Sequence, residues 1–373
     1  MTTPHQLLLQ TIIEEAKGQK VDALCTKLLD PATTESRQRV ILDCLKTINK
    51  TAALNPLEQF RTLKLAKNKE VASRAEEVIL ALGGLALVAE PEELRSGKIK
   101  SYRNPNEEYA EYILIPGGSY LYSVTEKVEH TENLFVAKYP VTNKLYRTFI
   151  VSLQSTAPVK SQFTAELTRI AEENFWGPGF GDYLREGKND LAALLRSKYD
   201  EDRKFGGEQQ PVVGITWYAA RAYCLWLSMF DGRVREYRLL NEVEWEWVAG
   251  GKQGTSGERV RQYHWPEERG EAKPALLNYN NNVGATTPVG SYPDGATPEG
   301  LYDMAGNVWE WCSDWYGSRG SFVDPLGPET GSSRVLRGGS WDFTAGYCRS
   351  AFRFSFHPVN RRDGVGFRLV FVP

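Results

Sequence analysis

Cysteine and histidine are scarce in this chain of 373 residues, which contains five cysteines and four histidines. The cysteines are odd in number and widely spaced, which excludes a disulfide-dense scaffold and favours a reducing compartment. We therefore expect a cytoplasmic protein. The histidines are equally scattered, and the sequence has no HExxH or CxxC motif, so no zinc site of a familiar type is predicted.

The chain also lacks a dominant charge and a long apolar run. It has 45 Lys and Arg against 47 Asp and Glu, a formal net charge of −2. Such a balance offers no basic field to nucleic acid or to an anionic membrane, so we expect neither as a partner. The longest apolar run, residues 78–89, contains two glycines and is too short to span a bilayer. The N-terminus shows no export signal.

Aromatic residues are almost absent from residues 1–85, where Phe60 is the only one, whereas all ten tryptophans lie at or beyond Trp176. This change of composition predicts a domain boundary. Apolar residues recur at helical spacing in residues 1–85, which predicts a small all-α module of four or five helices. The module contains no catalytic pattern, and we expect it to bind a protein partner. The polar residues 86–108, with two prolines, are predicted to form a linker.

Residues 109–373 show a mixed pattern that predicts an α+β domain. Residues 112–115 and 133–137 have the apolar character of strands. Capping side chains precede helical patterns at several points. They are Thr142, Thr216 and the Asn241-Glu244 capping box.

Two stretches of this domain are poor in regular patterns. Residues 155–210 are polar and are predicted to be an insertion with one helix at 189–198. Beyond Gly250 the chain is rich in Gly, Asn, Pro and aromatic residues, which predicts a loop-rich structure. Buried ion pairs are expected to fix such loops, and we expect Arg337, Arg353 and Arg368 to form them.

Four motifs in the last part of the chain are highly specific. They are GLYDMAGNVWEWC at 300–312, RGGSW at 337–341, CRSA at 348–351 and GFR at 366–368. In sequence and order they resemble the signature of the formylglycine-generating-enzyme (sulfatase-modifying-factor) superfamily. This resemblance implies a C-type-lectin fold, α+β and loop-rich, which the small helical module would precede.

The same resemblance bears on catalysis. Members that produce formylglycine use a copper-binding pair of cysteines five residues apart, which begins three residues after the GGS motif. Phe343 stands at that first position here, and no second cysteine lies within five residues of Cys348. One thiol cannot form the pair. We therefore expect no catalytic residue and no copper, zinc or nucleotide cofactor. The alternative is a formylglycine-generating-type oxidase or related enzyme that uses Cys348.

The C-terminal stretch also resembles the variable proteins of diversity-generating retroelements, which share this fold. Their mutagenesis acts on template adenines, and Lys, Glu, Gln, Met and Trp cannot be reached from Asn codons by that route. Residues 342–365 contain none of these five types, although the types make up 76 of the 373 residues and about five would be expected. We predict a variable region at about 341–365 that displays a diversified, non-catalytic surface and binds an unknown ligand, expected to be a protein.

The predicted ligand-binding positions lie between residues that resemble fixed scaffold. They are Asp342, Phe343, Thr344, Ala345, Gly346, Tyr347, Phe352, Phe354, Ser355, Phe356, His357, Val359, Asn360, Arg362, Asp363 and Val365. The aromatic residues among them allow two interpretations. Alternation at 352, 354 and 356 is expected of the core of a strand pair. Exposed, the same side chains would form an apolar patch typical of binding surfaces.

The superfamily resemblance also implies calcium. Two sets of oxygen ligands match by position. The first is Asn278, Asn281 and the carbonyls of Tyr279 and Val283, and the second is Asp303, Glu310 and the carbonyls of Gly306 and Val308. The alternative is that these residues form asparagine turns and a buried ion pair.

Overall fold

The computed structural model describes residues 12, 15, 18, 20–48, 57, 60, 71, 74, 75, 78, 99–154, 158–187, 190–230, 235–251, 257–317 and 328–373. The chain divides into two compact units, Met1–Glu90 and Pro91–Pro373. Their boundary falls inside the predicted linker. In the described part of the chain, no helix has the length and apolar character that crossing a membrane requires.

The first unit is helical, as predicted. Helices α2 (Val21–Leu29) and α3 (Glu35–Ile48) pack through apolar residues spaced three and four apart, including Leu24 and Leu28 on α2 and Ile41 on α3. Phe60, the one aromatic residue of this unit, is 1% exposed in the same core. The number of helices cannot be compared with the predicted four or five, because much of the unit lies outside the described residues.

The second unit contains a five-stranded antiparallel sheet in the order β1-β2-β5-β11-β6. The strands are β1 (Ser101–Asn104), β2 (Ala110–Ile115), β5 (Leu134–Ala137), β6 (Arg238–Leu239) and β11 (Leu369–Phe371). The two predicted strands are therefore confirmed as β2 and β5. The C-terminal strand β11 lies between β5 and β6, so the end of the chain is built into this sheet.

The predicted linker is wrong over its last residues, because β1 and the 3₁₀ turn η2 (Pro105–Glu107) belong to the domain. Tyr102 on β1 is 1% exposed and packs edge-on against Phe371, with ring centroids 5.9 Å apart. Glu107 is 4% exposed and accepts hydrogen bonds from the Tyr112 and Tyr223 hydroxyls. The polar composition of this stretch concealed a strand with alternate residues buried.

A four-stranded sheet with the order β10-β7-β8-β9 carries the C-terminal motifs. Its strands are β7 (Trp309–Trp315), β8 (Arg334–Arg337), β9 (Arg353–Phe356) and β10 (Val365–Gly366). β10 pairs with β7 in parallel, and the other neighbours are antiparallel. A separate hairpin joins β3 (Gly118–Leu121) to β4 (Val128–Thr131).

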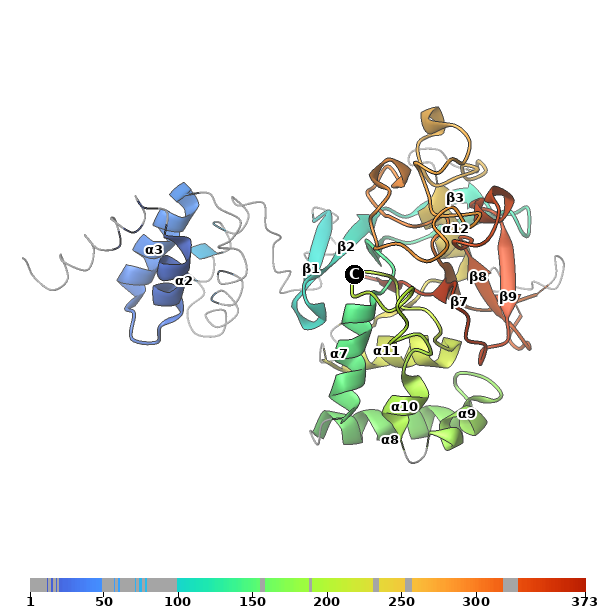
Figure 1. The fold of residues 1–373 in the computed structure, drawn as a ribbon, viewed down its shortest axis with the longest axis horizontal. Helices are drawn as coiled ribbons and strands as arrows, with labels where there is room; N and C mark the ends of the chain where they lie inside the picture. Colours follow the sequence, from blue (N-terminus) through green and yellow to red (C-terminus); the bar gives the residue numbers. More distant parts are fainter. Residues whose placement is uncertain are drawn as a thin grey trace, which may run out of the picture. The chain divides into compact units, whose positions relative to one another are not determined.

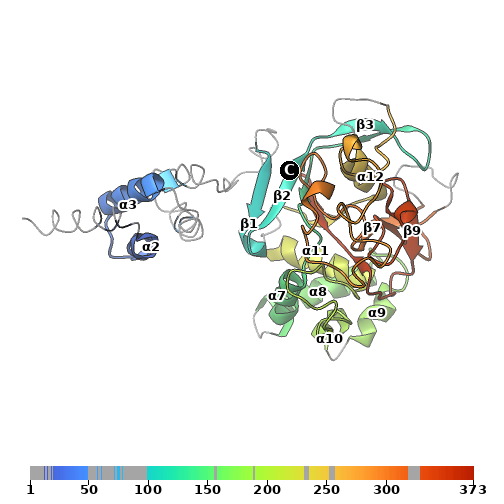
Figure 2. The same ribbon diagram turned by 45° about the horizontal axis from the view of Figure 1, so that its top comes forward.

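Helices gather at one end of this unit, as both ribbon views show (Figures 1 and 2). They are α7 (Asn143–Gln154), α8 (Pro158–Glu172), α9 (Phe180–Glu186), α10 (Leu191–Leu195) and α11 (Trp217–Phe230). The predicted helix at 189–198 is confirmed as α10, but α8 and α9, which lie in the same insertion, were not predicted. α8 was missed because its buried stripe of Phe163, Leu167 and Ile170 is narrow and the surrounding residues are polar.

Helix α12 (Glu242–Gly250) packs against β4, β7 and β8. The predicted capping box is confirmed, since the Glu244 amide donates to Asn241 Oδ1 and the Asn241 amide donates to the Glu244 carboxylate. Every residue of α12 is buried, Glu242 and Glu246 included. Buried carboxylates require partners, and the arginines of the neighbouring strands provide them.

Candidate functional site

The sheet of β7, β8 and β9 has a charged side and an apolar side. Arg353 on β9 lies opposite Arg337 on β8, and both contact α12. Arg353 Nη2 donates to Glu242 at 2.7 Å, and Arg337 Nη2 donates to Glu246. Because neighbouring residues of a strand point to opposite sides, Phe354 lies on the other side of the sheet.

On that apolar side, six rings form a continuous cluster, which we call the aromatic face. Its members are Trp309, Phe343, Tyr347, Phe352, Phe354 and Phe356. Trp309 forms the floor and is 1% exposed, and its ring stacks on Phe354 with centroids 5.3 Å apart. Tyr347 is the most exposed member at 37% and lies 4.8 Å from Phe352. The cluster joins β7 and β9 to the 3₁₀ turn η5 (Ala345–Cys348).

Fifteen of the sixteen predicted ligand-binding positions are at least partly exposed. Asp342, Thr344, Gly346, Tyr347, His357, Val359 and Arg362 are exposed, and Phe343, Ala345, Phe352, Phe354, Ser355, Phe356, Asn360 and Asp363 are half-buried. Val365 is the exception and was assigned wrongly. It is 1% exposed because β10 pairs it with Trp309.

The alternation at Phe352, Phe354 and Phe356 is therefore that of a strand, but this side of the strand is not core. The four phenylalanines are half-buried against one another and against Trp309. Arg362 adds a positive charge at the edge, with its guanidinium carbon 5.9 Å from the centre of the Phe356 ring. The structure thus presents an apolar surface with a supporting layer beneath it, a form suited to binding.

Cys348, the thiol of the catalytic alternative, is buried in a core cluster with Tyr263 and Trp265. It is 1% exposed, and burial raises the pKa of its thiol to about 12. The thiol is consequently protonated at neutral pH, whereas redox and metal-binding cysteines react as thiolates. Gly339 packs directly against it, and a Cβ at that position would lie 2.5 Å from the sulfur. All five cysteines are free.

The first set of predicted calcium ligands contains one atom that fits a cation site. Asn278 is fully buried, and its Nδ2 donates to the Ala285 carbonyl at 2.8 Å. Its Oδ1 is buried without a hydrogen-bond donor among the described residues. Such an oxygen suits a hard cation. Asn281 and Val283 are exposed, Tyr279 is half-buried, and Asn281 has the left-handed φ of 58° common in asparagine turns.

In the second set, Glu310 already has a cationic partner. Its carboxylate is 1% exposed and accepts hydrogen bonds from Arg368 Nε at 2.8 and 2.9 Å. Trp245 Nε1 donates to it at 2.8 Å. A calcium ion here would have to displace the arginine, so Glu310 fits the buried ion pair that was the alternative interpretation.

Asp303, the other acidic member, belongs to a polar network that the sequence did not reveal. It accepts from the Gly290 amide at 2.9 Å and from Asn307 Nδ2 at 3.3 Å, and burial raises its pKa to about 6. Asn307 also accepts from the Thr287 amide and is fully buried. Gly306 and Val308 flank Asn307, and the Val308 amide donates a hydrogen bond to the Gly306 carbonyl. Asn307 lies within the 300–312 motif, and this motif was the sequence signal from which the network could have been found.

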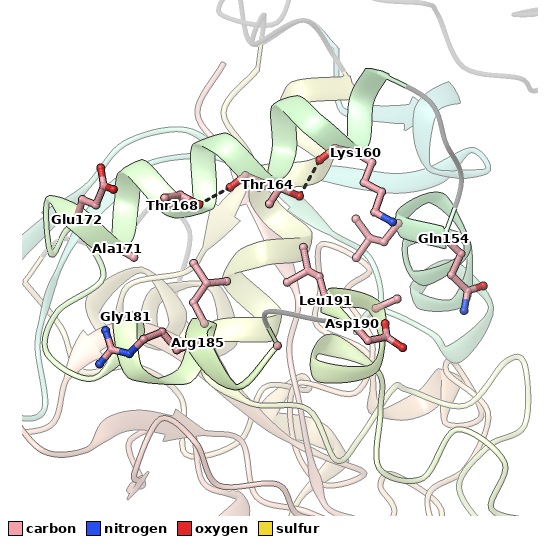
Figure 3. Close-up of a pocket in the computed structure, with 14 residues that line it drawn as sticks. Gln154, Lys160, Thr164, Thr168, Ala171, Glu172, Gly181, Arg185, Asp190 and Leu191 are labelled. Atoms are coloured by element: carbon pink, nitrogen blue, oxygen red, sulfur yellow. Dashed lines mark hydrogen bonds between the residues drawn. The ribbon is translucent and has the colours of Figure 1, made fainter.

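A cavity of about 870 Å³ lies between α8 and the pair α9 and α10 (Figure 3). Thr164 and Thr168 line it from α8, and Leu191 from α10 (Figure 3). The Thr164 and Thr168 hydroxyls donate to backbone carbonyls one turn earlier, at 2.8 and 3.0 Å. None of the predicted site residues lines this cavity. The described residues contain no group of three or more His, Cys, Asp or Glu side chains placed to hold a metal.

The sequence of this chain is similar to those of several known proteins. Residues 98–372 match the model of the sulfatase-modifying factor enzyme 1-like domain. The chain is 29% identical to serine/threonine-protein kinase pkn1 of Chlamydia caviae over 96% of its own length and 53% of that protein. It is 38% identical to the formylglycine-generating enzyme of Streptomyces coelicolor, over 44% of this chain and 53% of that one. It therefore spans about half the length of the curated relatives it matches.

Among solved structures, PvdO from Pseudomonas aeruginosa overlays with a TM-score of 0.51 at 22% identity. The alignment covers 72% of this chain and 96% of PvdO. This likeness concerns the fold and agrees with the loop-rich α+β architecture described above.

Proposed function

The chain belongs to the family of the sulfatase-modifying factor enzyme 1-like domain, and we propose that within this family it is a ligand-binding protein rather than a catalyst. It has the C-type-lectin fold of the formylglycine-generating type, preceded by a small all-α module. Its binding surface is the aromatic face together with the exposed positions of residues 342–363. Diversification of these positions would change the ligand and leave the scaffold intact.

One observation carries the proposal. Residues 342–365 contain no Lys, Glu, Gln, Met or Trp, the five residue types that adenine-directed mutagenesis of Asn codons cannot produce. All but one of the predicted variable positions in it are at least partly exposed, whereas the intervening Cys348 and Pro358 are buried. Substitutions at exposed sites change stability little, while those in a core cost kilocalories. Variation confined to the first group is therefore compatible with one fold.

The surface also has the chemistry of a protein-binding site. Exposed or half-exposed aromatic rings and arginines dominate the energetics of protein interfaces. Tyr347 combines apolar area with a hydroxyl, and Arg362 adds a charge beside Phe356. We therefore propose that the ligand is a protein.

A matched pair of display libraries tests this function. In the first, five surface positions vary over the residues reachable from Asn codons, and selection is made against immobilised lysozyme. They are Tyr347, Phe352, Phe354, Phe356 and Val359. In the control, five buried residues vary in the same way. They are Val335, Leu336, Phe367, Leu369 and Val370.

We expect the surface library to yield folded lysozyme binders and the control library to yield mostly unfolded clones, because buried substitutions leave cavities or unpaired polar groups. Equal loss of folded protein in both libraries would show that the aromatic face is core and would contradict the proposal.

The catalytic alternative has one observation in its favour, the similarity to a protein named formylglycine-generating enzyme. It would use Cys348, whose thiol is buried and protonated at neutral pH. We expect a CxPxR peptide incubated with the protein, copper and a reductant to acquire no aldehyde. Its detection by mass spectrometry above a Cys348→Ser control would favour the enzyme.

Three further proposals accompany this function. The helical module binds a protein partner, since its described core is formed within the module and its sequence contains no catalytic pattern. The protein works in a reducing compartment such as the cytoplasm, which suits five free thiols. Calcium binds at Asn278, where the unpartnered Oδ1 supports a site.

A further inference from the structure

A second hollow adjoins the aromatic face and is lined by arginines. It has a volume of about 490 Å³, and Arg259, Arg261, Arg349 and Arg353 all line it. We call it the arginine pocket. Phe352 belongs both to this lining and to the aromatic face, so the two surfaces are continuous.

The lining has an excess of positive charge. No carboxylate is among the lining residues in the described part of the chain. The charge of Arg353 is neutralised by its hydrogen-bonded partner Glu242. Arg259 is exposed, and its Nη2 lies 3.4 Å from Glu126 Oε1. Exposed Arg349 donates from Nε to the Gly346 carbonyl at 2.9 Å, a neutral acceptor. Among the described residues, the charges of Arg349 and Arg261 thus have no bonded carboxylate.

Arg261 is the most informative residue of the pocket. Its Nε and Nη2 are buried and have no hydrogen-bond acceptor among the described residues. Burial lowers its pKa, and the more distant Glu299 and Glu267 offset this only in part. Its backbone is fixed, because the Arg261 amide donates to the Gly250 carbonyl at 2.7 Å. Such buried, unpaired donors are costly in a folded protein and are typical of groups that bind an anion.

We propose that the arginine pocket binds a phosphate or carboxylate group, and that this group belongs to the ligand held by the aromatic face. The second clause rests on the proposed function, whereas the first does not. Guanidinium groups form charge-assisted, often bidentate hydrogen bonds with both oxyanions. None of the four arginines is a predicted variable position. The pocket would therefore be a constant anchor for an anionic group, while the neighbouring aromatic positions vary and select what surrounds it.

Thermal unfolding of the full chain tests the pocket with small anions. Sodium phosphate and sodium glutarate are titrated separately, each against sodium chloride of equal ionic strength, which removes general screening. The variants are Arg261→Gln and Arg349→Gln. Arg203→Gln is the matched control, because Arg203 is exposed and lies outside the pocket.

We expect one or both oxyanions to raise the melting temperature of the wild type more than chloride does. The larger response identifies phosphate or carboxylate as the preferred group. Each pocket substitution should weaken the apparent affinity about tenfold or more, since it removes charged hydrogen bonds, and Arg203→Gln should not. Arg261→Gln should also leave the melting temperature of the anion-free protein unchanged or higher, because its unpaired charge stabilises nothing there.

The proposal is wrong if neither anion exceeds chloride, or if both pocket variants respond as the wild type does. It is also wrong if Arg261→Gln lowers the anion-free melting temperature while Arg349→Gln keeps its full response, since Arg261 would then be structural. A variant with Tyr347→Asn and Phe356→Asp should keep the response to the preferred anion, so failure of the pocket and failure of the aromatic face are seen separately.

Discussion

Single buried charges fix the loops on which the aromatic face depends. Arg337, Arg353 and Arg368 form the buried ion pairs expected from the motifs. The partners of Arg337 and Arg353 could not be predicted from spacing, because Glu246 and Glu242 lie about a hundred residues away on α12. A motif identifies a buried arginine, but only the fold brings its carboxylate to it.

Cys348 is a second single residue that the sequence alone leaves open to two interpretations, one catalytic and one structural. Its position near the GGS motif is compatible with a catalytic role, and its CRSA neighbours are compatible with a structural role. Burial favours the structural interpretation, since it raises the pKa of the thiol to about 12. Burial of one side chain is a property of the whole packing and cannot be obtained from the local sequence.

Glu107 provides a prediction at this scale. Burial raises its pKa to about 7 from a usual value of 4.5, although Tyr112 and Tyr223 donate hydrogen bonds to it. The folded protein therefore holds this proton more tightly than the unfolded chain does. Its contribution to stability is fully present below about pH 4.5 and is lost as the pH rises through about 7.

We expect the unfolding free energy of the wild type to fall relative to that of Glu107→Gln by up to about 3 kcal/mol across this range. Urea unfolding at several pH values measures both proteins. Parallel pH profiles for the two would contradict the shift.

Among elements, strand β9 and helix α12 were the most predictable and the insertion was the least. The alternation of β9 and the capping box of α12 are local patterns, and both occur as the sequence indicates. Helices α8 and α9 and strand β1 are polar on their outer sides, so only packing against neighbouring helices or against β2 reveals them. The side of β9 that faces outward was likewise set by its neighbours, β8 and α12.

The loop from Asn278 to Val283 carries the prediction about calcium. If Asn278 Oδ1 is a ligand, calcium should raise the melting temperature, because an ion that binds only the folded state stabilises it by about 2.7 kcal/mol at a hundred times its dissociation constant. EDTA should reverse the effect. Asn278→Asp should keep the response, and Asn278→Leu should abolish it. A melting temperature indifferent to calcium in all three proteins would favour a purely structural asparagine turn.

At the scale of the whole molecule, the change of composition near residue 85 predicted two units, and the contacts divide the chain at Glu90. Limited proteolysis should therefore cut first between residues 86 and 98, ahead of the buried strand β1, and leave a stable fragment of about 30 kDa. N-terminal sequencing of the fragment locates the cut. First cuts within β1 or η2, or no surviving fragment, would contradict an independent second unit.

The central claim, that the C-terminal surface is diversified for binding, is tested most directly by sequencing the DNA beside the gene. We expect a near-copy of the segment that encodes residues 337–368, differing from it only where the copy has adenine, next to a reverse transcriptase gene. The differing codons should fall at exposed and half-buried positions such as Phe343, Tyr347 and Phe354, and should spare Cys348 and Arg353. Absence of such a copy, or differences at other bases and at buried codons, would contradict the account.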